Sequence, residues 1–272
     1  FRIYSMTKPL VSVAAMILVE EGRLQLTDAV SRHLPGFDRM VVSEPRLDPI
    51  TAAVSFVQVP AARPMTVQDL LRHTSGLTYA PFGRSAVKDE YAKADINPGL
   101  RQLPFDLSEM ARRLGKMPLA FAPGTTWDYS ISTDVLGLVV ERVSGRKLDA
   151  FLQQRILGPL GMKDTAFWVP PEKQSRLAEA FPADPDSKAK VELLDVRSAP
   201  TLLSGGGGIL IRQRDAAHQS VVGVQRDQQS VGLIRLDRML GDARDHARLY
   251  IARRADFERD PPLAIVCLLY TS

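Results

Sequence analysis

The sequence predicts a globular protein with several helices and one candidate strand, long enough for one large domain or two small ones. Apolar residues make up 45% of its 272 residues and charged residues 24%, proportions that are typical of proteins with a sizeable core. Apolar residues recur at helical spacing in several segments, and glycines and prolines separate these segments. The chain is therefore expected to fold around a buried core.

Charge and hydropathy exclude two classes of partner. The net charge of +4 comes from scattered residues rather than a basic run, so we expect no nucleic-acid partner. The longest apolar run, residues 10–19, is shorter than the ~18 residues that span a bilayer, so we expect no membrane span. The only cysteine, Cys267, excludes an intrachain disulfide.

The first half of the chain shows three helix signals. Residues 8–21 are apolar on nearly every side, which predicts a buried helix with Pro9 in its first turn. A short helix capped by Thr27 and Asp28 should follow, and Thr66 should cap another. The alternating residues 53–59 form the candidate strand, and residues 78–104 read as irregular.

Three further helices are expected. Ser108 should begin one that Gly115 ends. Ser132 or Thr133 should cap a helix over residues 134–143 that ends at Gly145, and residues 147–157 should form the next.

The composition changes after Gly208. Every lysine lies at or before Lys190, yet residues 209–262 carry ten arginines. Residues 211–272 are either a basic amphipathic tail or, as we favour, a segment outside the native reading frame. We therefore divide the chain into a hydrolase-like part, residues 1–210, and an atypical segment, residues 211–272.

Ser5 and Lys8 are the first candidate catalytic pair. Residues three apart share one face of a helix, so Lys8 can take the proton that makes a serine hydroxyl nucleophilic. This role requires a neutral lysine, which burial in an apolar helix favours. The alternative is a helix cap beside a solvated lysine. Tyr129, in the loop before a capped helix, can serve as a second acid or base. Its alternative is a buried aromatic bonded to a backbone carbonyl.

Five segments, in this order, resemble the serine β-lactamase-like family. They read FRIYSMTKPL at 1–10, LLRHTSGL at 70–77, PGTTWDYSISTDVLGLVVERVSG at 123–145, ILGPLGMKDTAF at 156–167 and LLSGGGGIL at 202–210. This family includes class C β-lactamases, family VIII carboxylesterases and penicillin-binding carboxypeptidases. The resemblance implies an α/β (α+β) fold of the β-lactamase/transpeptidase type, with a mixed sheet built from both chain ends beside a mainly helical domain. This sequence would be a fragment, truncated at its N-terminus and atypical after about residue 210.

The resemblance also implies roles for the candidate residues. Ser5 would accept the acyl group, Lys8 would be its general base partner, and Tyr129 would be the second acid/base. Two departures from the family pattern follow. Ile131 stands where class C β-lactamases carry an amide-binding Asn, which favours small esters over lactams. No KTG, HTG or WxG motif follows Gly208, and because in the family that strand supplies the second oxyanion N–H, reduced activity is expected of this chain.

The expected function is therefore that of a serine hydrolase with a Ser-Lys acyl-enzyme mechanism, acting on a small-molecule ester or lactam. A β-lactamase, a D-alanyl-D-alanine carboxypeptidase and a catalytically dead fragment are the alternatives. No cofactor is expected, and the four histidines are too far apart in sequence to show metal-ligand spacing. His73 is expected to form structural hydrogen bonds rather than to act as a catalyst. The sequence assigns neither a compartment nor an oligomeric state.

Overall fold

The computed structural model describes residues 1–96, 102–184, 186–191 and 193–211. Segment 212–272 lies outside this part, so the interpretation of residues 211–272 as an atypical tail remains a prediction. The helices of the described part are α1 (Thr7–Glu20), α2 (Val67–Arg72), α3 (Ala86–Lys93), α4 (Leu107–Leu114), α5 (Ser132–Ser144) and α6 (Leu148–Leu152). A 3-10 turn, η1 (Tyr4–Met6), precedes α1, and a π-helical turn, η4 (Gln153–Leu157), continues α6.

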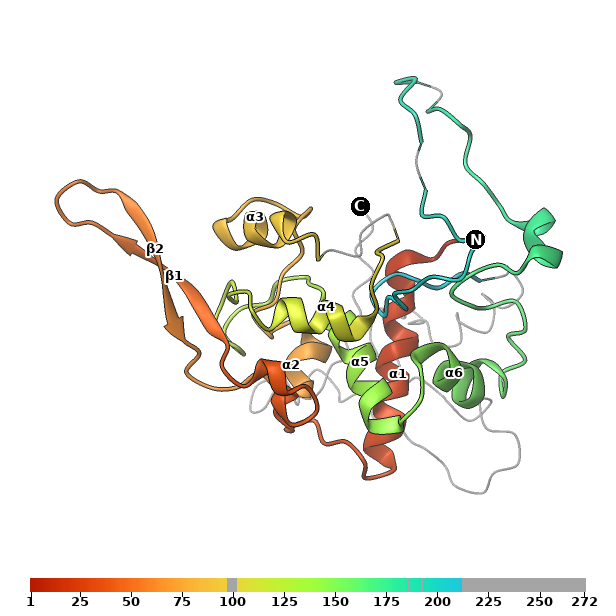
Figure 1. Cartoon of the computed structure of the whole chain (residues 1–272), viewed down its shortest axis with the longest axis horizontal. Helices are drawn as coiled ribbons and strands as arrows, with labels where there is room; N and C mark the ends of the chain where they lie inside the picture. Colours follow the sequence, from red (N-terminus) through yellow and green to blue (C-terminus); the bar gives the residue numbers. More distant parts are fainter. Residues whose placement is uncertain (97–101, 185, 192, 212–272) are drawn as a thin grey trace, which may run out of the picture.

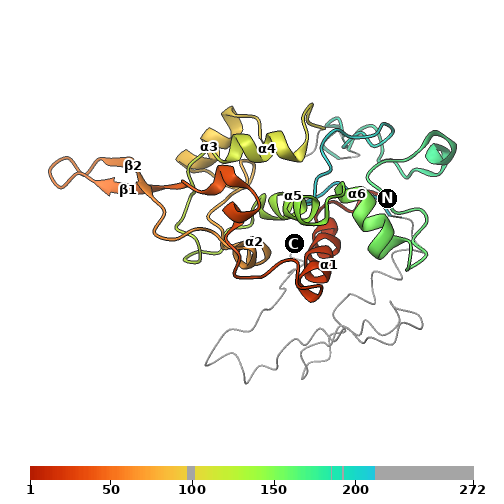
Figure 2. The same ribbon diagram turned by 60° about the horizontal axis from the view of Figure 1, so that its bottom comes forward.

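Helix α5 lies at the centre of the helical core. It packs against α1, α2, α4 and α6, and Figures 1 and 2 both show α5 beside α1. Gly137 permits this packing, because a side chain there would press on Leu148 of α6. The central helix of the core therefore directly follows the loop that carries Tyr129.

Helix α1 is enclosed, as its apolar sequence predicts. No residue from Thr7 to Val19 is exposed, and Val11, Ala14 and Leu18 are fully buried. Pro9 sits in the first turn, where the missing N–H breaks no helical hydrogen bond. The enclosed helix places Lys8 inside the protein and leaves the preceding turn at the surface.

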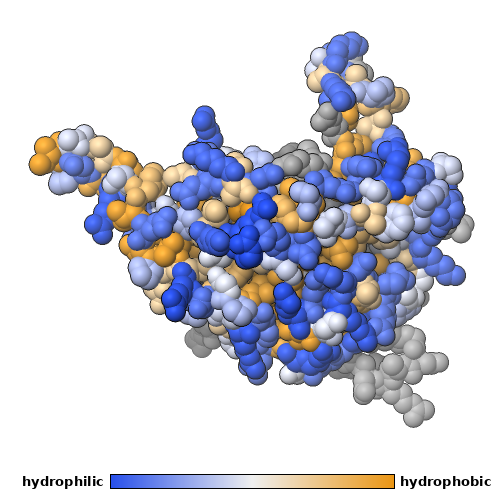
Figure 3. Space-filling model, in the orientation of Figure 1, coloured by the Kyte–Doolittle hydropathy of each residue, from blue (hydrophilic) through white to orange (hydrophobic). Residues whose placement is uncertain are grey.

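A β-hairpin extends away from the helices. Strand β1 (Val41–Leu47) pairs antiparallel with β2 (Val54–Pro60), from Val41↔Pro60 to Leu47↔Val54. Figure 1 shows the hairpin projecting from the body, and Figure 3 shows hydrophobic residues, coloured orange, on its surface. Its exposed apolar side chains include Ile50 and Phe56. The candidate strand at 53–59 is confirmed, whereas its partner strand was not anticipated.

Both ends of the described chain meet beside α1. The Ile3 N–H donates to Ile209 O at 3.2 Å, and the Ile211 N–H donates to Phe1 O at 2.9 Å. Leu210 also exchanges two backbone hydrogen bonds with Ala166. These isolated bridges join segments from both ends of the described chain. The mixed sheet expected from the resemblance is not formed within the described residues, where the β1–β2 hairpin is the only sheet.

Several local expectations need correction. The cap of α4 is Asp106, whose side chain accepts the Glu109 N–H, rather than Ser108. Helix α5 begins at Ser132 with no side-chain cap, because the Ser132 hydroxyl bonds to other serines. Helix α3 lies within the stretch read as irregular, with Ser85 as its cap.

The region expected to form a capped helix after Thr27 contains two 3-10 turns, Val30–Arg32 and Pro35–Phe37. Asp28 does not cap a helix there. Its carboxylate instead accepts hydrogen bonds from the Gln25 N–H and the Arg32 guanidinium.

Candidate active site

Ser5 and Lys8 lie one helical turn apart at the start of α1. Ser5 belongs to the exposed 3-10 turn, and Lys8, only 3% exposed, belongs to the first turn of the buried helix. Lys8 Nζ lies 3.3 Å from Ser5 Oγ. The spacing therefore brings a buried amine within hydrogen-bond distance of an accessible hydroxyl.

Tyr129 approaches the same hydroxyl from a different part of the chain. Its hydroxyl donates to Ser5 Oγ at 2.5 Å, and its ring centroid lies 4.6 Å from Lys8 Nζ. The structure thus brings all three predicted site residues together, although 124 residues separate Tyr129 from Ser5. Ser5 Oγ has a hydrogen-bonding group on either side.

A glycine-rich turn closes the site behind Lys8. Lys8 Nζ donates to the Gly206 carbonyl at 2.7 Å. Gly206 cannot be replaced by a larger residue without displacement, because a Cβ there would collide with the Asp134 carboxylate and the Tyr79 hydroxyl. The backbone of the SGGGG segment therefore contacts the Lys8 amine directly.

Asp134 is a buried residue of this site that sequence reasoning placed only within a helix. Its Oδ1 accepts the Ser204 hydroxyl at 2.6 Å and the Gly206 N–H at 3.0 Å, and its Oδ2 accepts the Tyr79 hydroxyl at 3.2 Å. Burial raises the pKa of Asp134 above its ordinary value, although Ser204, the charge on Lys8 and Gly206 act in the opposite direction. The signal available in the sequence was an acidic residue directly before the mostly apolar residues 135–140.

His73 is neutral and bonded to the backbone of the Tyr129 loop. Burial, with the charge on Lys8 as a second cause, lowers its pKa to about 4. The Ser130 N–H donates to Nδ1 at 3.2 Å, so Nδ1 is the unprotonated nitrogen. The His73 ring also packs against the Tyr129 ring, with 5.0 Å between centroids. His73 therefore forms the structural hydrogen bonds expected of it.

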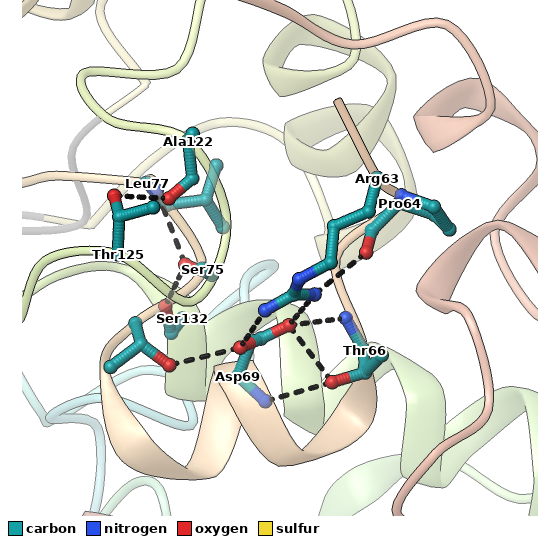
Figure 4. Close-up of polar contacts among 10 residues, drawn as sticks. Arg63, Pro64, Thr66, Asp69, Ser75, Leu77, Ala122, Thr125 and Ser132 are labelled. Carbon is teal, nitrogen blue, oxygen red and sulfur yellow. Dashed lines mark hydrogen bonds and ion pairs between the residues drawn. The ribbon is translucent and has the colours of Figure 1, made fainter. Parts of the chain in front are cut away.

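A chain of buried hydroxyls links the HTSGL segment to α5. The Ser130 and Ser132 hydroxyls lie 2.7 Å apart, as do those of Ser132 and Ser75. The Leu77 N–H donates to Ser75 Oγ, which Figure 4 shows beside Ser132. These bonds join two segments that flank the site.

Figure 4 also shows the contacts of Asp69, which anchors the HTSGL segment to α2. Asp69 of α2 accepts two hydrogen bonds from Arg63 at 2.7 and 2.9 Å and forms a capping box with Thr66. It also accepts the Thr74 hydroxyl at 3.0 Å. Burial raises the pKa of Asp69, but the Arg63 and Thr66 donors outweigh it and hold the pKa below its usual value.

The side chain of Ile131 faces the core. It is only 1% exposed and belongs to the hydrophobic core, so it presents neither a polar group nor an accessible surface beside Tyr129. Trp127, in contrast, is 60% exposed and meets His73 edge-on. The aromatic side chain that contacts Ser5 from this loop is Tyr129.

Comparison with known proteins defines the family. A family model described as Beta-lactamase matches residues 1–264. The chain therefore belongs to the beta-lactamase family, in its broad sense of serine hydrolases that share this fold.

Two curated relatives illustrate the range of the family. An uncharacterised protein of Mycobacterium tuberculosis is 32% identical over 262 residues, which cover 92% of this chain and 62% of the relative. The esterase EstB of Burkholderia gladioli is 41% identical over 169 residues, which cover 61% of this chain and 38% of EstB. The chain thus spans less than two thirds of the length of either relative.

Solved structures confirm the β-lactamase/transpeptidase-like fold. One similar structure is EstCE1, described as a hydrolase with promiscuous acyltransferase activity. It aligns with a TM-score of 0.61 and 26% sequence identity, over 82% of this chain and 58% of EstCE1. Within the described residues, no helix combines the length and the apolar character needed to cross a membrane.

Proposed function

We propose that this chain hydrolyses small carboxylic esters through an acyl-enzyme on Ser5. One observation carries the proposal: Ser5 Oγ lies within hydrogen-bond distance of both Lys8 Nζ and the Tyr129 hydroxyl. A serine between two groups able to exchange protons meets the requirement of nucleophilic catalysis. The printed descriptions of EstB and EstCE1 add support for ester chemistry.

Acylation requires the neutral form of Lys8, whose amine then accepts the Ser5 hydroxyl proton as Oγ attacks the ester carbonyl carbon. A tetrahedral intermediate forms with negative charge on the former carbonyl oxygen. Its collapse breaks the bond to the alcohol oxygen, and the Tyr129 hydroxyl supplies the proton with which the alcohol leaves. Lys8 then returns a proton to Tyr129, whose ring lies against Nζ.

Deacylation reverses these roles. Water attacks the acyl carbonyl and gives a proton to the neutral Lys8 amine, the bond between the acyl carbon and Ser5 Oγ breaks, and Lys8 returns that proton to Oγ as the acid leaves. An alcohol in place of water would transfer the acyl group instead of hydrolysing it.

The side chain at position 131 favours esters over β-lactams. A lactam carries a side-chain amide, and the buried Ile131 presents no hydrogen-bonding group to it. Simple esters require no such contact. The proposed substrate class therefore rests on the missing hydrogen-bonding group at position 131 as well as on the relatives.

The test is p-nitrophenyl butyrate hydrolysis by the 272-residue chain, its Ser5→Ala variant and a Ser12→Ala control. Ser12 is a buried serine of the same helix without a role in the mechanism. We expect hydrolysis to disappear in Ser5→Ala and to persist in Ser12→Ala. A chain folded by circular dichroism but inactive would overturn the proposal, and faster turnover of a cephalosporin than of the ester would refute the ester assignment.

A further inference from the structure

Asp134 is a buried carboxylate next to the proposed site that the mechanism above does not use. It is fully buried on α5, yet it faces the glycine turn that contacts Lys8. Three donors converge on it, from Ser204, Gly206 and Tyr79. Such a set suits an ionised carboxylate, which only accepts hydrogen bonds.

The contacts of Asp134 continue to Lys8 through a single residue. Asp134 Oδ1 accepts the Gly206 N–H at 3.0 Å, and the carbonyl of the same glycine accepts the Lys8 amine at 2.7 Å. The Ser204 hydroxyl, bonded at 2.6 Å, fixes the other end of the turn to the same oxygen. The carboxylate thereby fixes the turn that orients Lys8 toward Ser5.

A purely structural role would not require a charge at this position. Burial raises the pKa of Asp134, so its ionised form costs stability as pH rises from its ordinary pKa through its folded-state pKa. An asparagine fits the same space and can still accept from Gly206 through its oxygen. The ionised carboxylate thus costs folding stability, and the contacts that it makes with Ser204, Gly206 and Tyr79 show where it acts.

Asp134 differs in charge from the other titratable groups that surround Lys8. Tyr79 and Tyr129 face Lys8 with their rings, at 5.6 and 4.6 Å, and His73 is neutral at physiological pH. Asp134 is the acidic side chain of this group, and its charge interacts with that of Lys8.

We propose that Asp134 is a positioning residue of the Ser5 site: its carboxylate holds the Ser204–Gly206 turn so that the Gly206 carbonyl fixes Lys8 beside Ser5. This inference rests on the proposed function and extends it to a residue that does not touch the substrate. Asp134 acts on the reaction only through Gly206 and through its field at Lys8.

The first test compares Asp134→Asn with Glu141→Gln. Glu141 lies two turns along the same helix, is also buried with a raised pKa, and accepts the Leu148 N–H away from the site. We expect Asp134→Asn to lower kcat/KM for p-nitrophenyl butyrate about tenfold, because an amide oxygen accepts weaker hydrogen bonds than a carboxylate. The acidic limb of its pH–rate profile should move to lower pH, since loss of the negative charge favours the neutral amine. Its melting temperature at neutral pH should not fall, and Glu141→Gln should change neither rate nor profile.

A second pair of variants leaves the carboxylate in place. In Gly206→Ala the new methyl group would collide with Asp134 and Tyr79, whereas in Gly207→Ala it would make ordinary contacts of 3.7–3.9 Å with Tyr4. We expect Gly206→Ala to lose activity at least as strongly as Asp134→Asn, and Gly207→Ala to retain it.

The outcomes separate this inference from the proposed function. Ser5-dependent hydrolysis that Asp134→Asn leaves within about twofold, with an unchanged pH profile, would overturn the positioning role alone. An equal loss in Glu141→Gln, or a rate loss matched by a lower melting temperature, would overturn it as well. Hydrolysis that survives Ser5→Ala would overturn the proposed function and, with it, this inference.

Discussion

Tyr129 contributes two separable groups to the proposed site. Its hydroxyl donates to Ser5 Oγ at 2.5 Å, and its ring lies 4.6 Å from Lys8 Nζ. Phenylalanine keeps the ring and removes the hydroxyl. A single substitution therefore distinguishes proton transfer from packing.

We expect Tyr129→Phe to lower kcat/KM for ester hydrolysis by about 100-fold or more, as loss of an acid/base group does. Tyr91→Phe is the matched control, because the Tyr91 hydroxyl is buried and bonded to Pro118 O, away from Ser5. Steady-state kinetics with p-nitrophenyl butyrate measures both. A Tyr129→Phe variant within threefold of the parent chain, roughly the scatter of such comparisons, would remove Tyr129 from the mechanism.

His73 should make the folded state sensitive to mild acid. Its folded-state pKa, about 4, lies below the ordinary value of 6.5, so the unfolded chain binds the proton first as pH falls. The contribution of His73 to the free energy of unfolding is therefore fully present above pH 6.5. It is lost progressively as pH falls from 6.5 toward 4.

Urea unfolding at about pH 7 and about pH 5 should show a loss of about 2 kcal/mol from this residue. In His73→Gln, which cannot titrate, the difference between the two pH values should be smaller by that amount. An equal pH dependence in the parent chain and in His73→Gln would contradict the assignment of a low pKa to His73.

At the scale of elements, α2 is held by an unusually complete cap. Asp69 bonds to Arg63, Thr66 and Thr74 at once, and its side chain is buried. Helix α4 has a simpler cap, in which Asp106 accepts a single backbone N–H from Glu109. The two caps therefore form a natural comparison.

We expect Asp69→Ala to lower the free energy of unfolding by about 2 kcal/mol, because it removes one half of the capping box and the acceptor of the Thr74 hydroxyl, while the partly exposed Arg63 guanidinium stays solvated. Asp106→Ala should cost about 1 kcal/mol. Chemical denaturation measures both values. Equal losses in the two variants would show that the contacts of Asp69 with Arg63 and Thr74 add nothing to the cap.

The helices show which local signals suffice. Thr66 has a carboxylate three residues later, and the structure confirms it as a cap. Ser132 was also expected as a cap, but Val135 rather than a carboxylate lies three residues later, and its hydroxyl bonds to Ser75 and Ser130 instead of capping α5. A tertiary contact across 57 residues thus overrides the local preference.

The missed helix α3 has a different explanation. It is short and polar, and its two buried residues, Val87 and Tyr91, are too few to stand out as an apolar stripe. Its cap, Ser85, was the remaining signal.

At the scale of the whole molecule, the fold joins segments that the sequence keeps apart. Ser5 and Lys8 could be paired from their spacing alone, since one helical turn relates them. Gly206 reaches Lys8 across 198 residues and Asp134 across 72. No periodicity predicts such contacts, so the turn behind Lys8 and the carboxylate that holds it became visible only in the structure.

The central claim is that Ser5 is the acyl-accepting nucleophile, and covalent labelling tests it most directly. The 272-residue chain would be treated with a serine-reactive phosphonate, and the modified peptide identified by mass spectrometry. We expect one label per chain, on Ser5, which is absent in Ser5→Ala and present in Ser12→Ala. A label on another serine, or labelling that persists in Ser5→Ala, would contradict it.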